Sequence, residues 1–188
     1  MKRKIALVHG RFQPLHNEHL HDYILKAWKT SKCDFMYIGI TNPDPTHIKP
    51  SRSDKQRSKP QNNPLDFIER LEIIKAAMIE AGITLQQFDI IPFPINVPGV
   101  LKYYAHPNFK HYLTIFDQWG KDKQAELMST FGEKNVVVLF EGTERDKKIT
   151  STMVRTKIKS GEKWEYLVPP AVAKYLKEKD LIDRIIKL

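Results

Sequence analysis

The stretch Ile5-Ala6-Leu7-Val8-His9-Gly10-Arg11-Phe12-Gln13-Pro14-Leu15-His16-Asn17-Glu18-His19 decides the fold of this 188-residue chain. Its first residues are an apolar run, which predicts a buried strand over residues 4–9 that ends at Gly10. Apolar residues then recur at helical spacing from Leu20 to Ala27, so a helix is expected over residues 17–30. The chain therefore begins with the strand–turn–helix unit of an α/β protein.

A polyphosphate site is predicted at this turn. His16 and His19 are three residues apart and share one face of the first helical turn, which also carries unpaired backbone N–H groups and the positive end of the helix dipole. Arg11 supplies forked donors, and Gly10 lets the backbone approach a ligand closely. Open α/β sheets bind ligands just beyond their strand ends, where these groups lie.

Composition limits the protein class. A hydrophobic content of 41% suits one good core, and a formal charge of +9 fits nucleic acid, anionic lipid or phosphorylated small molecules without choosing among them. The lone Cys33 suits a reducing compartment, and no signal peptide or apolar run of membrane length stands out, so a cytoplasmic protein is expected. A metal site at the two histidines would need a third ligand, and none is expected nearby.

Strands and helices alternate along the rest of the chain. Strands are expected over residues 35–40, 89–93, 113–116 and 135–140, and helices over residues 66–82, 122–131, 150–159 and 170–179. This alternation predicts an α/β fold with a Rossmann-like, doubly wound parallel sheet and C-terminal helices. No linker interrupts it, so a single domain over residues 1–188 is expected. A basic, proline-rich loop over residues 42–64 is interpreted as a lid or binding loop, or as a plain insertion.

A second segment with functional character is Ile149-Thr150-Ser151-Thr152-Met153-Val154-Arg155. Its hydroxyls open the predicted helix, and Arg155 follows on their face. The simplest interpretation is an N-cap followed by a surface arginine. The functional interpretation is a second helix N-terminus that binds a phosphate, with Arg155 adding charge.

Together the two segments resemble a known family. They look like the HxGH and ISSTxxR motifs of the nucleotidyltransferase superfamily, and they are most similar to those of the archaeal-type nicotinamide mononucleotide adenylyltransferases. Residues 63–70, 90–96 and 161–169 echo the shared pattern in the same order. The resemblance implies a Rossmann-like sheet, a nucleoside triphosphate lying across the first helix, and Mg²⁺ as the assisting ion.

In that family, an acceptor phosphate attacks the α-phosphorus and pyrophosphate leaves. The resemblance implies that His16, His19 and Arg155 are catalytic. It further implies that the nucleotide contacts Gly10, Arg11, Phe12, His16, His19, Thr150, Ser151, Thr152 and Arg155. A phosphomonoester has its second pKa near ~6 and is largely dianionic at pH 7, so the nucleophile needs no general base. We therefore expect both imidazoles to donate hydrogen bonds to the phosphates rather than to accept protons.

The chain departs from the family pattern on the acceptor side and at one motif position. Position 18 is Glu where the motif usually has Gly, which puts a carboxylate beside the expected nucleotide. The loop before Asn63 is longer and more basic than usual, and Arg57 within it is predicted to contact the acceptor. The family's stacking tryptophan is absent from the loop after residue 95. Tyr103 or Tyr104 is expected to replace it, with Asn96 bonding an amide, although both tyrosines also suit core or rim positions.

The sequence predicts an enzyme that moves a nucleoside monophosphate from a triphosphate to a phosphorylated acceptor. The preferred reaction is adenylyl transfer from ATP to nicotinamide or nicotinate mononucleotide, a step of NAD biosynthesis. One alternative is a cytidylyltransferase acting on a phosphoalcohol, phosphonate or sugar phosphate. Another is a non-catalytic RNA-binding module. The sequence contains no nucleic-acid-binding motif, which argues against this alternative. Small-molecule nucleotides are the expected partners, neither nucleic acid nor membrane is expected, and the sequence leaves a homo-oligomer open.

Overall fold

Five parallel strands form one sheet in the computed structural model, which describes residues 3–47, 58–97 and 99–188. They are β1 (Ile5–Gly10), β2 (Phe35–Ile40), β3 (Phe88–Pro92), β4 (Lys110–Ile115) and β5 (Val136–Glu141), in the order β3-β2-β1-β4-β5. Because the strand order reverses between β1 and β4, a crevice is expected at their carboxyl ends. The predicted doubly wound parallel sheet is confirmed.

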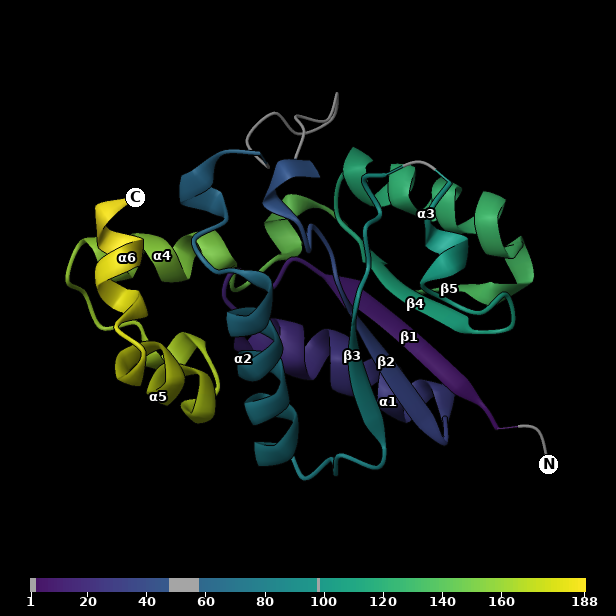
Figure 1. Cartoon of the computed structure of the whole chain (residues 1–188), viewed down its shortest axis with the longest axis horizontal. Helices are drawn as coiled ribbons and strands as arrows, with labels where there is room; N and C mark the ends of the chain where they lie inside the picture. Colours follow the sequence, from purple (N-terminus) through teal and green to yellow (C-terminus); the bar gives the residue numbers. More distant parts are fainter. Residues whose placement is uncertain (1–2, 48–57, 98) are drawn as a thin grey trace.

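Helices cover both faces of this sheet (Figure 1). The π-helix η1 (His19–Ile24) continues into α1 (Leu25–Ser31), and α2 (Phe67–Glu80) follows on the same face. The opposite face is covered by α3 (Gln118–Phe131) and the 3₁₀ turn η4 (Leu101–Tyr103). Near the C-terminus, α4 (Ser151–Lys159), α5 (Pro170–Glu178) and α6 (Leu181–Lys187) lie beside α2, on the side away from α3.

Two apolar clusters hold these layers together. One lies between the sheet and α1, α2 and the C-terminal helices, and it includes Val8, Ile38 and Ile74. The other lies between the sheet and α3, and it includes Leu7 and Phe93. Successive β1 residues thus point to opposite faces, as in any strand that is buried on both sides.

Local capping explains where the helices begin. Asp66 caps α2 in a capping box with Glu69, at the start of the helix that the sequence predicts over residues 66–82. Asp117 accepts a hydrogen bond from Gly120 N at 2.6 Å, so α3 begins at Gln118 rather than at the predicted residue 122. The separate helix α6 was not expected, because the sequence analysis ended the terminal helix at residue 179.

The basic loop is only partly described, because residues 48–57 lie outside the described ranges. Its start is tied to the end of β2 through the buried Arg70 of α2. The Arg70 guanidinium donates to the carbonyl oxygens of Thr41, Asn42 and Arg11 at 2.8, 2.8 and 3.1 Å. Arg70 thereby joins the end of β2 to the turn after β1, which brings that loop beside the first motif.

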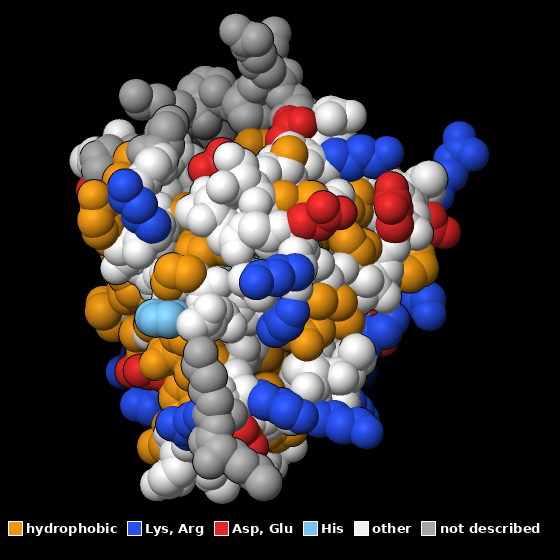
Figure 2. Space-filling model, turned by 90° about the vertical axis from the view of Figure 1, so that its right-hand side faces the viewer, with side chains coloured by type: hydrophobic (Ala, Val, Ile, Leu, Met, Phe, Trp, Pro, Cys, Tyr) orange, Lys and Arg blue, Asp and Glu red, His pale blue; other side chains and the backbone are white. Residues whose placement is uncertain are grey.

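Surface charge is dispersed on the side that carries α3 and β5. Figure 2 shows Lys and Arg side chains there, interspersed with acidic and apolar ones rather than joined in one stripe. Within the described residues, no helix combines the length and apolar character needed to cross a bilayer.

Candidate active site

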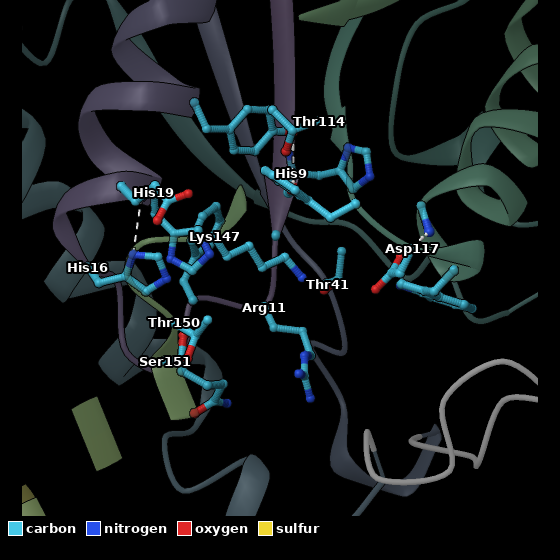
Figure 3. Close-up of a pocket in the computed structure, with 18 of the residues that line it drawn as sticks. His9, Arg11, His16, His19, Thr41, Thr114, Asp117, Lys147, Thr150 and Ser151 are labelled. Atoms are coloured by element: carbon cyan, nitrogen blue, oxygen red, sulfur yellow. Dashed lines mark hydrogen bonds between the residues drawn. The ribbon is translucent and has the colours of Figure 1, made fainter. Parts of the chain in front are cut away.

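A cavity of about 480 Å³ opens at the carboxyl ends of β1 and β4, where the strand order reverses. Its walls come from the turn after β1, the end of β2, the β4–α3 connection and the segment entering α4 (Figure 3). The volume lies within the range usual for small-molecule sites. Both motifs therefore meet at one pocket, although some 130 residues separate them.

The turn after β1 is shaped by Gly10 and Phe12. Phe12 is buried and has a φ of 52°, in the left-handed region that costs a residue with a side chain some free energy. A Cβ on Gly10 would lie 2.7 Å from the Phe12 ring. The absence of a side chain at Gly10 therefore makes room for this ring, whereas the sequence analysis assigned it to the approach of a phosphate. Both residues line the pocket.

The paired histidines are stacked and uncharged. The rings of His16 and His19 lie 3.6 Å apart, and the His19 backbone N–H donates to His16 Nδ1 at 3.3 Å. Because Nδ1 accepts, the proton of neutral His16 lies on Nε2, which is then a donor. Burial lowers the pKa of His16 to about 3, with Lys147 adding to the effect. Burial and the neighbouring His16, Arg11, Lys147 and Lys123 also lower the pKa of His19.

The second motif begins α4, as predicted. Thr150 is the N-cap and accepts from Met153 N at 3.1 Å. Ser151 Oγ donates to the carbonyl oxygen of Pro14 at 3.0 Å, which joins the two motifs directly. Thr150, Ser151 and Thr152 all line the pocket.

Arg155 lies behind the pocket wall, not on it. Its guanidinium donates to Gln13 O at 2.7 Å, to Asn62 Oδ1 at 2.5 Å and to Thr152 Oγ1 at 3.1 Å. Arg155 is 5% exposed and does not line the cavity, and burial lowers its pKa to about 10, so it stays charged at neutral pH. These three acceptors use three of the five guanidinium N–H groups, and Arg155 is not among the residues that line the cavity, whereas the sequence predicts a direct contact with the phosphates.

Among the residues that the structure describes, three cations on the wall supply positive charge. Arg11 was predicted, whereas Lys123 of α3 and Lys147 were missed. Figure 3 shows the Lys147 side chain extending into the pocket beside His19. Lys147 Nζ lies 2.6 Å from Glu144 Oε1 and 5.0 Å from the centre of the Phe116 ring. A lysine two residues before the motif was a signal that the sequence analysis overlooked.

Curated relatives show the same pair of activities that the motifs implied. A phosphonoformate cytidylyltransferase of Streptomyces viridochromogenes is 37% identical over 180 residues, which cover 96% of this chain and 94% of the relative. A nicotinamide-nucleotide adenylyltransferase of Thermococcus kodakarensis is 30% identical over 183 residues, which cover 97% and 87%. The chain belongs to the nucleotidyltransferase family that these enzymes represent. No protein-family model matches the chain.

Solved structures agree on the fold. A bifunctional NMN adenylyltransferase/ADP ribose pyrophosphatase from Francisella tularensis, complexed with AMP and a manganese ion, has a TM-score of 0.66 at 18% identity. The match covers 98% of this chain and 52% of that protein, so the chain spans about half of it. A putative nicotinate-nucleotide adenylyltransferase from Vibrio parahaemolyticus has a TM-score of 0.55 at 16% identity, covering 96% and 95% of the two chains.

The acceptor side of this nucleotidyltransferase differs from the prediction. Tyr103 and Tyr104 are 77% and 43% exposed and do not line the pocket, so neither is placed to stack on a bound ring. The reason is the turn η4, which buries Leu101 and Ala105 in the α3-side cluster and thereby directs the residues between them outward. Arg57 lies outside the described residues.

Asn96 does line the pocket, and its amide Nδ2 donates to Asn42 Oδ1. Thr41, Thr114 and Trp119 line the same region and were not predicted. Thr41 directly follows β2 and Thr114 lies near the end of β4, and this nearness to strand ends is the one signal that would have drawn attention to them. Trp119 lies in the first turn of α3.

Carboxylates are present on the wall of this nucleotidyltransferase pocket but do not form a cage for an ion. The described residues contain no group of three or more His, Cys, Asp or Glu side chains that could hold a metal. Glu144 is paired with Lys147, and Asp117 caps α3. An ion at this site would therefore depend on oxygen atoms supplied by a substrate.

Proposed function

We propose that this nucleotidyltransferase moves the adenylyl group of ATP onto nicotinamide or nicotinate mononucleotide, with release of pyrophosphate. The observation that carries the proposal is the convergence of two neutral imidazoles, three cations and the hydroxyls of α4 on one cavity. Phosphate oxygens are the ligand that such a set of donors suits best. The choice of ATP and the mononucleotide as substrates is based on the relatives that are nicotinamide-nucleotide adenylyltransferases.

In the proposed step, an oxygen of the acceptor phosphate forms a bond to the α-phosphorus of the triphosphate. The bond from that phosphorus to the oxygen bridging to the β-phosphate breaks, and the electron pair leaves with pyrophosphate. His16 and His19 donate from uncharged rings to oxygens on which negative charge builds, while Lys147, Lys123 and Arg11 neutralise it. Catalysis is then alignment and charge stabilisation, and no proton moves.

Magnesium fits this scheme as an ion carried by the triphosphate. Mg²⁺ keeps several waters and binds through phosphate oxygens with only one or two carboxylates. Glu144, beside Lys147 on the pocket wall, would take a place in its coordination shell. When bound, the ion would neutralise charge on the leaving pyrophosphate.

A second candidate is cytidylyl transfer from CTP to a small phosphonate or phosphoalcohol. Two observations favour it: the cytidylyltransferase relative is 37% identical, and neither tyrosine expected to stack on nicotinamide lines the pocket. Transfer of a cytidylyl group would use the same phosphate contacts.

A substrate grid tests both candidates. The four nucleoside triphosphates are each combined with nicotinamide mononucleotide, nicotinate mononucleotide, phosphonoformate and glycerol phosphate, and pyrophosphate and product mass are measured. We expect pyrophosphate and a dinucleotide from ATP with a mononucleotide. Product from CTP with phosphonoformate alone would replace the first candidate by the second. Salt-sensitive RNA binding without pyrophosphate release from any pair would refute both.

A further inference from the structure

Glu18, which stands where the family motif usually has Gly, joins the two motifs through backbone hydrogen bonds. Its Oε2 accepts from Lys148 N at 3.0 Å and from Ile149 N at 2.7 Å, across some 130 positions of sequence. Glu18 is half-buried and lines the pocket. The carboxylate therefore lies against the segment that leads into α4.

Through this contact, the carboxylate of Glu18 binds the adjacent backbone amides of Lys148 and Ile149. Hydrogen bonds to a charged acceptor are about twice as strong as neutral ones, and both N–H groups converge on the same oxygen. Two adjacent amides just before a helix N-terminus would otherwise be an attractive site for a phosphate oxygen. Because Glu18 already occupies these two amides, they are not available to a polyphosphate, and the side-chain cations on the wall become more important for its binding.

The amides that Glu18 holds are next to Lys147. This residue is one of the three cations on the wall, and its side chain extends into the pocket (Figure 3). Fixing the amides of Lys148 and Ile149 fixes the backbone from which Lys147 projects. The other direct links between the motifs, from Ser151 to Pro14 and from Arg155 to Gln13, act further along α4.

We propose that Glu18 is a positioning residue that latches the Lys147–Thr150 segment onto the first motif and so sets Lys147 against the triphosphate. This inference rests on the proposed function for its kinetic consequence, whereas the latch itself can be tested without any substrate. It explains why a carboxylate is tolerated at the pocket wall, since two backbone N–H groups stabilise its charge.

The first experiment measures the latch alone. Amide hydrogen exchange of Lys148 and Ile149 is compared between the wild-type protein, Glu18→Gln and Glu18→Ala. We expect Glu18→Ala to raise both exchange rates by about tenfold or more, in line with the loss of a hydrogen bond to a charged group. Glu18→Gln keeps an accepting oxygen and should retain most of the protection. Unchanged exchange in Glu18→Ala would overturn the proposal.

The second experiment measures the consequence for Lys147. The assay uses the nucleotide and acceptor pair found in the substrate grid. Glu18→Ala should raise the KM for the triphosphate by roughly tenfold, whereas the KM of the separate variant Glu18→Gln should stay within about threefold of the wild-type value. In a Lys147→Ala background, Glu18→Ala should have little further effect, because the two residues act in series. Additive losses in the double variant, or equal losses in Glu18→Gln and Glu18→Ala, would overturn the latch.

Asp22→Asn is the matched control for charge. It removes an equal negative charge from the same pocket wall and leaves both amide contacts of Glu18 in place. Loss of a negative charge beside an anionic ligand should by itself lower the KM for the triphosphate or leave it unchanged, and this is the result expected for Asp22→Asn. If Asp22→Asn instead raises the KM as much as Glu18→Ala does, the rise does not depend on the amide contacts and the latch is refuted. If no variant and no wild-type protein releases pyrophosphate, the proposed function fails, while the amide exchange still decides the latch.

Discussion

At the scale of single residues, the proposed function depends on imidazoles that carry no charge. His16 is buried, its Nδ1 accepts from His19 N, and its pKa is lowered to about 3. A neutral ring has one donor, and here the hydrogen bond at Nδ1 fixes that donor at Nε2. Donors that are already aimed cost no reorganisation as the charge on pyrophosphate develops, so they stabilise the transition state more than the bound substrate.

The replacement His19→Ala tests this role. Loss of one such donor is expected to lower kcat by about 100-fold, roughly 3 kcal/mol, with the KM for the triphosphate changed far less. The measurement is steady-state pyrophosphate release at saturating acceptor. His21→Ala is the control, because His21 lies on the same helix but is exposed and does not line the pocket. Equal losses in kcat and in nucleotide affinity would contradict the role.

At the scale of elements, one guanidinium links α4 to two other segments around the pocket. Arg155 reaches from α4 to Gln13 in the turn after β1 and to Asn62 in the turn η3 (Pro60–Asn62). The planar guanidinium of Arg155 therefore connects three segments that line or support the pocket. A lysine ammonium cannot make these hydrogen bonds at the same time. In this arrangement Arg155 joins the segments around the pocket from behind its wall.

Arg155→Lys separates the two possible roles of this residue. Because a lysine cannot reach Gln13 O and Asn62 Oδ1 together, the variant should lose about 2 kcal/mol of unfolding free energy. Urea denaturation measures this, and Lys159→Ala, an exposed site on the same helix, should leave stability nearly unchanged. Undiminished stability with a raised KM for the triphosphate would show instead that Arg155 binds a phosphate, as the sequence analysis expected.

Sequence patterns located the elements better than the contacts between them. The apolar runs at β1 and β2 and the caps Asp66 and Thr150 follow from local chemistry, so they were predictable. The targets of Glu18 and Arg155 are backbone amides and carbonyls far away in sequence, which carry no residue-type signal. The outward direction of Tyr103 depends on which neighbours η4 buries, and that is decided by tertiary packing.

At the scale of the whole molecule, buried histidines link stability to pH. Burial lowers the pKa of His9 and of His16, and it lowers the pKa of His111 to about 4. His111 is fully buried, its ring stacks on Phe131 at 4.2 Å, and neither ring nitrogen has a hydrogen-bond partner among the described residues. In the unfolded chain these groups bind protons near pH 6.5, whereas in the folded chain they remain neutral.

The sign of the effect follows directly, because the unfolded state binds more protons below pH 6.5. The free energy of unfolding therefore decreases as the pH falls below 6.5. Each such histidine lowers it by about 2 kcal/mol at pH 5 relative to pH 7.5. His111→Phe keeps an aromatic ring against Phe131 and removes one site, so its unfolding free energy should fall about 2 kcal/mol less than that of wild type between pH 7.5 and pH 5. Urea midpoints and slopes at the two pH values measure this difference. If the variant loses as much stability as wild type over this range, His111 takes up its proton in the folded protein at the same pH as in the unfolded chain, and the prediction is wrong.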